Sequence, residues 1–409
     1  MNTYLDQDKL KSSRTKIGIY LGSEPESGGM FQYGLSILDA AASLPKDRYK
    51  TIIACTTERW EEHLKFLGLE HFRISQNLLW RIFKGKGWLL LNLPISFWQR
   101  AFFNFNPAFS RRLIEESCSL WIFPSQDTWT YLLPLNSLGI IHDLMHRYER
   151  KFPEAAAPLE YLRREKHYRA ICKYSRGILV DSNCGGKQVM ESYKVHADRI
   201  HVLPYVPPGY INSQGHSINF DTKYELPRKF FFYPAQFWEH KNHHNLLAAL
   251  AGLKREINDI HLVLVGSAKN AYKKTLEYLN SMDLSNNVTI LGYVSSEDMP
   301  ELYHRTRALI FPSFFGPTNI PPLEACATGC PMAVSNIYGM PEQLGDAALF
   351  FNPNAVDEMM NAMKRLWTDD DLCRQLSRNG KKRAALWNQN SFNGKFQTII
   401  EDVARTADS

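Results

Sequence analysis

The sequence predicts an α/β protein with two doubly wound, mainly parallel sheets. Short β-rich runs alternate with longer helical runs up to about residue 203, and the alternation starts afresh after a proline-rich segment at 204–210. A chain of 409 residues is also too long for one ordinary hydrophobic core. These observations indicate two domains joined by a linker.

The first domain is expected over residues 1–205. A strand at 16–22 leads into a glycine-bearing loop and a helix that ends near Ser43, which is how a doubly wound unit opens. Gly28 and Gly29 let a phosphate or sugar approach the backbone closely, although a tight turn would explain them equally well. Further strands are expected at 51–55, 119–123, 138–142, 177–181 and 199–203, with helices at 159–174 and 185–193.

His142 and Asp143 fall where the strand at 138–142 should end. In open parallel sheets, ligands bind beyond the carboxyl ends of the strands. A histidine placed there can donate to substrate oxygens or move protons near neutral pH. The alternative is a local structural hydrogen bond between the two side chains.

A linker at 206–228 precedes the second domain, which is expected over 229–388. The predicted strands lie at 229–233, 260–265, 288–291 and 308–311, and the predicted helices at 242–257, 271–283, 297–306, 356–367 and 370–387. Lys241 and Asn242 stand just before a helix, where a lysine suits phosphate as a point charge. Gly266 follows a strand and lets a ligand near the sheet edge.

The segment 312–353 is the most informative part of the chain. A loop containing Gly316, Thr318 and Asn319 leads directly onto a helix expected to start at Pro321 or Pro322. Glu324 then falls within the first turn or so, beside unpaired backbone N–H groups that form an anion site. A carboxylate there either complements the helix dipole or accepts hydrogen bonds from sugar hydroxyls.

Composition narrows the class of protein. Hydrophobic residues make up 44% and charged residues 22% of the chain, as in ordinary globular proteins. The seven cysteines are scattered without a CxxC pair, which favours free thiols in a reducing cytoplasm over metal ligands. The N-terminal segment lacks the apolar core of a signal peptide, and no run reaches the ~20 apolar residues of a membrane span.

The excess positive charge gathers in one window at 78–112. The window carries six basic residues, equal to the net charge of +6 for the whole chain, and contains no acidic residue. Aromatic side chains are interleaved with the basic ones, a pattern that suits an anionic membrane surface. The alternative is a pair of core-packed helices with a solvated basic edge. Nucleic acid is not expected, because no nucleic-acid motif accompanies the window.

Several segments resemble glycosyltransferase family 4, which comprises retaining sugar-nucleotide transferases with the GT-B fold. The strongest similarity lies at 311–353, including PPLEACATGC and EQLGDAALFF. The other family landmarks follow in the family's order: IIHDL at 140–144, HKN at 240–242, LVLVG at 262–266 and LGYVSSEDMPELYHRTRALIFPS at 291–313. The resemblance implies two Rossmann-like domains facing a cleft, a C-terminal helix at 389–409 that crosses back to the first domain, and no essential metal or cofactor.

The resemblance also assigns roles by position. Glu324 would bind the donor ribose, Lys241 the donor diphosphate, and His142 the donor sugar. The remaining expected donor contacts are Gly28, Gly29, Gln236, Asn242, Gly266, the backbone near Val294, Gly316, Thr318, Asn319 and Ile320. Two positions depart from the family pattern, because Gly316 replaces the first of two glutamates and Gln236 and Ala235 stand where an arginine is usual.

The implied function is the retaining transfer of a sugar, with mannose or a related sugar favoured, from a sugar nucleotide to a glycan hydroxyl. The setting would be bacterial-type polysaccharide or lipopolysaccharide synthesis, with a GDP-sugar favoured over a UDP-sugar and a lipid-linked glycan as a fitting acceptor. The chain would be cytoplasmic and peripheral on the inner membrane. The alternatives are a non-catalytic, sugar-nucleotide-binding partner of an active transferase and a sugar-nucleotide epimerase.

Overall fold

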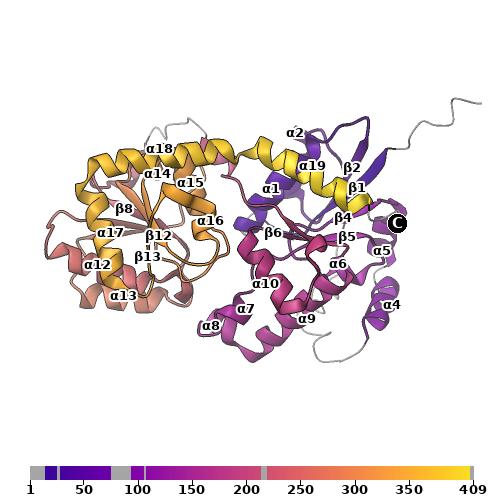
Figure 1. Ribbon diagram of the computed structural model, residues 1–409, viewed down its shortest axis with the longest axis horizontal. Coiled ribbons are helices and arrows are strands. Elements are labelled where there is room, and N and C mark those ends of the chain that lie inside the picture. The colour runs from indigo at the N-terminus through magenta and orange to yellow at the C-terminus, as the bar shows by residue number, and fades with distance from the viewer. Residues whose placement is uncertain (1–13, 25–27, 75–93, 106, 213–218, 406–409) are drawn as a thin grey trace, which may run out of the picture.

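The computed structural model describes residues 14–24, 28–74, 94–105, 107–212 and 219–405. The first domain is built on a seven-stranded parallel sheet with the order β3-β2-β1-β4-β5-β6-β7 (Figure 1). Its strands are β1 (Thr15–Leu21), β2 (Tyr49–Cys55), β3 (Glu70–Arg73), β4 (Leu120–Ile122), β5 (Ser137–Ile140), β6 (Gly177–Val180) and β7 (Ile200–Val202).

Helices cover both faces of this sheet. They are α1 (Gly29–Ala42), α2 (Glu61–Phe66), α4 (Ile95–Phe105), α5 (Pro107–Glu115), α6 (Trp129–Leu132), α7 (Met145–Tyr148), α8 (Pro153–Ala156), α9 (Pro158–Tyr174) and α10 (Asn183–Tyr193). Two apolar clusters result, one around Ile19 and Ile37 and the other around Trp121 and Trp129. Central strands such as β5 and β6 are wholly buried, so they consist of apolar and small residues.

The second domain has a six-stranded sheet with the order β10-β9-β8-β11-β12-β13. Its strands are β8 (Phe231–Pro234), β9 (Leu262–Val265), β10 (Val288–Gly292), β11 (Ala308–Phe311), β12 (Met332–Ser335) and β13 (Leu349–Phe351). Its helices are α12 (His243–Lys254), α13 (Tyr272–Ser281), α14 (Met299–Arg305), α15 (Ile320–Thr328), α16 (Met340–Leu344) and α17 (Val356–Thr368). The expected fold class, with two Rossmann-like doubly wound sheets, is confirmed.

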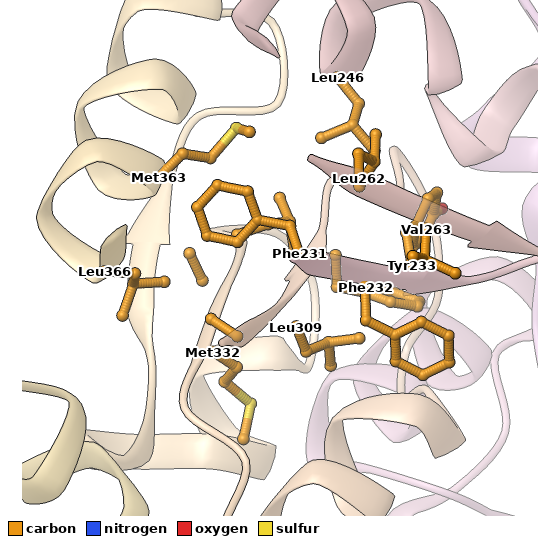
Figure 2. Close-up of a cluster of buried hydrophobic side chains, with 14 of the residues drawn as sticks. Phe231, Phe232, Tyr233, Leu246, Leu262, Val263, Leu309, Met332, Met363 and Leu366 are labelled. Carbon is orange, nitrogen blue, oxygen red and sulfur yellow. The ribbon is translucent and has the colours of Figure 1, made fainter. Parts of the chain in front are cut away.

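Side chains of successive residues in the central strands point to opposite faces of the second sheet. Phe231 and Met363 lie together in Figure 2, and the Phe231 ring is 4.9 Å from that of Trp367 on α17. The next residue, Phe232, points to the other face, where its ring lies 5.1 Å from that of Tyr303 on α14. Burying both faces fixes the strand register, because a slip of one residue would exchange the two sets of side chains.

The chain returns to the first domain at its C-terminal end. The helix α18 (Asp370–Leu386) runs along α15, and α19 (Gln389–Arg405) packs on α1 (Figure 1). Phe392, Phe396 and Ile400 of α19 are buried in a core cluster of the first domain. The short 3₁₀ helix η5 (Gly209–Asn212) lies on the connection between β7 and β8 and contacts both α14 and α15.

The basic aromatic window at 78–112 is described only in part. Residues 78–93 lie outside the described residues, and those that follow enter α4 and α5. Trp98 and Phe109 are buried in the first domain, whereas the side chains of Phe97 and Phe103 are 49% and 37% exposed. Among the helices that the structure describes, each is too short or too polar to cross a lipid bilayer.

Candidate active site between the two domains

A cavity of about 770 Å³ lies between the domains at the carboxyl ends of their strands. The first domain contributes Gly29, Ser125, Gln126, His142, Asp143, Arg163 and Arg164, among others. The second domain contributes Lys241 with its neighbours and the continuous loop 315–321. The structure therefore brings together Gly29, His142, Lys241, Gly316, Thr318, Asn319 and Ile320 of the expected site residues.

Lys241 is the cation that the second domain presents to this cavity. It ends the 3₁₀ helix η6 (Glu239–Lys241), and the next residue, Asn242, has a φ of 61°, which turns the chain into α12. Burial lowers the pKa of Lys241 to about 8, although the charges of Asp143 and Glu154 oppose this shift. Its Nζ donates to Asn319 Oδ1 at 3.5 Å. A desolvated ammonium group gains most from an anionic ligand, so this position suits a phosphate.

His142 lies two residues beyond β5, and both of its ring nitrogens have protein partners. Nε2 lies 3.1 Å from the carbonyl oxygen of Pro124, so Nε2 carries the proton and donates it. Nδ1 therefore accepts from the Tyr205 hydroxyl at 2.9 Å. Burial lowers the pKa of His142 to about 4, so the ring is neutral at pH 7. To bind a substrate oxygen, His142 must exchange one of these partners.

The loop from Gly316 to Ile320 has a conformation that depends on its glycine. Gly316 has a φ of 142°, and a Cβ atom there would lie 2.3 Å from Asn319 Nδ2. Asn319 precedes α15, and its backbone N–H donates to Gln343 Oε1 at 3.0 Å. Gly316 therefore fits the shape of this loop, and a glutamate side chain at this position would collide with Asn319.

Asp181 is a cleft residue that sequence reasoning did not identify. It follows β6, and its Oδ2 accepts from Thr318 Oγ1 at 2.7 Å across the interdomain boundary. Burial raises the pKa of Asp181 to about 7, although the hydrogen bond from Thr318 lowers it. The sequence placed this aspartate only at the end of a strand, and its partner lies 137 residues away.

Glu324 is buried away from the cavity. The helix α15 begins at Ile320 rather than at Pro321 or Pro322, which places Glu324 in the second turn. Its carboxylate accepts from the Tyr303 hydroxyl at 2.5 Å and from the Tyr210 hydroxyl of η5. Burial raises the pKa of Glu324, and these two hydrogen bonds oppose that rise.

A second cavity of about 770 Å³ lies on the other side of Tyr210. It is lined by Tyr210, Ser296 and residues of α1 and α18, among others. The two domains also approach closely at the first cavity. A Cβ atom on Gly29 of the first domain would lie only 3.3 Å from Cδ1 of Ile320 of the second domain. Tyr210 therefore stands between Glu324 and a space large enough for a nucleoside.

The other expected donor contacts lie outside the cavity lining. Asn242 is buried, and its Nδ2 donates to the carbonyl oxygens of Pro312 and Pro353 at 3.0 and 2.9 Å, which is a structural role. The exposed Gln236 accepts from Trp238 Nε1 at 2.9 Å. Gly266 lies against the backbone of Ala235, and the Val294 side chain belongs to the core of the second domain. Gly28 precedes α1 with a φ of 60° and open space around it.

Three further polar residues reach this region from the first domain. Arg163 and Arg164 of α9 both bind Glu160, and Arg164 also lies 3.6 Å from Asp143. Glu154 of α8 accepts from the backbone N–H of His240 at 3.0 Å and from Asn270 Nδ2 at 3.0 Å. In the sequence, Arg163 and Arg164 look like part of a solvated helix face. Only the tertiary structure shows that they line the interdomain cavity.

Apolar contacts accompany these polar contacts between the domains. Met145, Phe152 and Ala155 of the first domain form a buried cluster with Phe315 of the second domain. The Tyr338 hydroxyl donates to Glu149 nearby. The structure therefore holds the two domains against each other on the cavity side as well as through α19.

Comparison with known proteins relates the second domain to enzymes that transfer sugars. Residues 217–383 match the family model described as glycosyl transferases group 1. The chain is 40% identical over 83 residues to O-antigen chain mannosyltransferase B of Escherichia coli, which covers 20% of this chain and 22% of that protein. It is 26% identical over 242 residues to O-antigen chain mannosyltransferase RfbU of Salmonella typhimurium, which covers 58% of this chain and 64% of that protein. The chain thus spans less than two thirds of either relative.

The similarity to solved structures covers almost the whole chain. Anabaena Alr3699/HepE in complex with UDP and glucose superposes with a TM-score of 0.70 at 15% identity, covering 95% of this chain and 100% of that one. Such a low identity establishes the fold alone. The chain has the GT-B fold, and its residues 217–383 match the group 1 glycosyl transferases.

Proposed function

We propose that this protein is a glycosyltransferase that moves a sugar from a sugar nucleotide to a hydroxyl group of a glycan. The observation that carries the proposal is the half-buried Lys241, which faces the interdomain cavity beside the start of α15. A cation and a helix N-terminus at one point form a site for the diphosphate of the donor. The match of residues 217–383 to group 1 glycosyl transferases supports the same chemistry.

The relatives favour mannose as the transferred sugar. Two of them are named O-antigen chain mannosyltransferases, so a growing polysaccharide or lipopolysaccharide chain is the acceptor class that we propose. The solved structure with UDP and glucose supports a sugar nucleotide as donor. GDP-mannose is therefore the first donor to test, and UDP-sugars are the second.

The proposed chemistry depends on stabilising the leaving group. As the bond to the sugar breaks, the nucleotide diphosphate gains negative charge, which Lys241 and the backbone N–H groups at the start of α15 would stabilise. No metal ion is required in this scheme. We propose that the acceptor hydroxyl attacks from the face that the diphosphate leaves, so that the anomeric configuration is retained. The neutral His142 would serve as a hydrogen-bonding group toward the donor sugar.

A binding subunit without catalytic activity is the second candidate. Gly316 stands where the resembling family has a glutamate, and Glu324 is covered by two tyrosine hydroxyls. Such a subunit would bind a sugar nucleotide without transferring the sugar. Both candidate functions predict that the protein binds a sugar nucleotide, and only the first predicts that it transfers the sugar.

Thermal shift with GDP- and UDP-sugars tests the donor site directly. A ligand that binds only the folded state raises the melting temperature, and the rise is larger for a tighter ligand at the same concentration. The wild-type protein should be stabilised by at least one sugar nucleotide, and Lys241→Ala should lose most of that shift. Lys382→Ala, on the exposed face of α18, is the matched control and should keep the shift. An equal shift in both variants would remove Lys241 from the donor site.

We also propose that the protein works at the cytoplasmic face of the inner membrane, with the window at 78–112 on the lipid. The described part of this window exposes Phe97 and Phe103 on either side of the exposed Arg100. Replacing both phenylalanines with serine should reduce sedimentation with vesicles that contain anionic lipid, because the apolar anchor is lost. Sedimentation that depends neither on these residues nor on salt would contradict the proposal.

A further inference from the structure

The loop that follows β4 has an unusual backbone at Gln126. This residue has a φ of 54°, in the left-handed region that residues other than glycine seldom adopt. Such strain persists where the surrounding structure fixes it, and it gathers at functional sites. The loop lies at the carboxyl end of a central strand, and its residues Ser125 and Gln126 line the interdomain cavity.

The helix α9 holds Gln126 in this conformation through two successive residues. His167 Nε2 donates to the backbone carbonyl of Gln126 at 2.8 Å, and the Tyr131 hydroxyl donates to His167 Nδ1 at 2.9 Å. The Tyr168 hydroxyl donates to Gln126 Oε1 at 3.4 Å. The backbone and one side of the amide group are thus fixed before any ligand binds.

Each of the two loop residues that line the cavity has one polar side-chain atom without a partner in the part of the chain that the structure describes. They are Gln126 Nε2 and Ser125 Oγ, and both are buried. Leaving a buried donor unpaired costs free energy, so such an atom in a residue that lines a cavity calls for a water molecule or a ligand. A fixed amide donor beside a hydroxyl group matches the alternating donors and acceptors of a sugar.

We propose that Gln126 and Ser125 form the subsite for the acceptor glycan and bind hydroxyl groups of a neutral sugar residue. The inference rests on the proposed function, because it places the acceptor opposite the donor groups Lys241 and Asn319 of the same cavity. A neutral sugar fits better than a phosphorylated one, since Arg163 and Arg164 beside the loop are bound to Glu160. His167 and Tyr168 act as positioning residues for Gln126.

Binding of α-linked mannotriose to the full-length protein, followed by saturation-transfer NMR in the absence of donor, tests the subsite. Gln126→Gly removes the amide group and also relieves the positive φ, so this variant should fold at least as well as the wild type. We expect its affinity for mannotriose to fall about tenfold, as for one lost hydrogen bond in a buried site. Gln397→Ala on α19 is the control and should bind like the wild type.

The outcomes separate the subsite from the proposed function. Weaker mannotriose binding in Gln126→Gly, with an unchanged thermal shift by sugar nucleotide, supports the subsite. Equal binding by wild type and Gln126→Gly, or no binding by the wild type at millimolar mannotriose, overturns it. If mannotriose binding depends on Gln126 but no sugar nucleotide binds, Gln126 belongs to a glycan-binding site and the proposed function fails.

Discussion

At the scale of single residues, Lys241 is the side chain on which the proposed chemistry of the interdomain cavity depends. Its half-buried ammonium group has a pKa of about 8, against 10.5 for an ordinary lysine. Because the unfolded chain binds the proton more tightly, stability rises with pH from about 8 to 10.5 and the full cost of the buried charge is present below pH 8. A bound diphosphate would reverse this cost by pairing with the charge.

The activity of the free enzyme should therefore depend on the protonation of Lys241. We expect kcat/KM for the sugar nucleotide to fall as pH rises through about 8, because the neutral amine no longer attracts the diphosphate. Lys241→Arg keeps its charge at every pH tested and should lose this pH dependence while retaining part of the activity. A profile that is flat from pH 7 to 9.5 in the wild type would contradict the assignment.

The loop before α15 requires a glycine at position 316. A side chain at φ 142° is strained and would meet Asn319, so Gly316→Ala should destabilise the protein by about 1–3 kcal/mol in urea unfolding. The control is Gly394→Ala in α19, where the added Cβ meets open space and alanine should stabilise the helix by about 0.5–1 kcal/mol. If Gly316→Ala behaves like the control, the loop does not require glycine.

At the scale of elements, apolar β-rich runs predicted most strands of both sheets, and three strands were missed. The apolar run 308–311 coincides with β11, whereas β3, β12 and β13 were not predicted. β3 is polar and lies at the sheet edge, whereas β12 and β13 lie in the segment 312–353, where only a loop and a helix were expected. The turns that place Gly316 and Lys241 were found because glycine, proline and a strand end mark them locally.

The partners of the site residues could not be predicted in the same way. Tyr210 meets Glu324 across 114 residues, and Thr318 meets Asp181 across 137. Contacts of this kind depend on tertiary packing and leave no periodic pattern in the sequence. For the same reason, the arginines of α9 and the strained Gln126 were missed, while Gly29, His142 and Lys241 were found at the ends of predicted elements.

The 3₁₀ helix η5 places the Tyr210 hydroxyl on the Glu324 carboxylate. If Glu324 binds the donor ribose, then the Tyr210 hydroxyl occupies the place of a ribose hydroxyl and must leave first. Tyr210→Phe removes that competing hydrogen bond, so we expect nucleotide affinity measured by calorimetry to rise by about threefold to tenfold. Tyr303→Phe removes the other donor, and its buried ring stays in place on the far side of the carboxylate.

The Tyr303 variant serves as the comparison because it should leave the entry path to Glu324 unchanged. Glu324→Gln should weaken nucleotide binding when it is combined with Tyr210→Phe and when it is combined with Tyr303→Phe. Should Tyr210→Phe bind nucleotide with wild-type affinity while Glu324→Gln loses binding, Tyr210 is not a barrier to the ribose site. Wild-type affinity in Glu324→Gln would instead remove Glu324 from the nucleotide site.

At the scale of the whole molecule, the two domains face each other across the cavity that holds Lys241 and His142, and several segments connect them. The interdomain linker with η5, the returning helix α19 and the contacts of Glu154 and Phe315 all connect them. The second domain supplies Lys241 and the start of α15, and the first supplies Gln126 and His142. The proposed reaction therefore requires the two domains to face each other as they do in the structure, because neither domain alone presents both sets of groups.

If the proposed function is right, the groups around this cavity transfer a sugar from a sugar nucleotide to a glycan. The most direct measurement is mass spectrometry of a mannose-containing oligosaccharide incubated with the protein and GDP-mannose or UDP-sugars, followed by NMR of the new linkage. We expect an added hexose whose anomeric configuration matches that of the donor, with the product abolished by Lys241→Ala and kept by Lys382→Ala. Product formed equally by the Lys241 variant, or a product of inverted configuration, would contradict it.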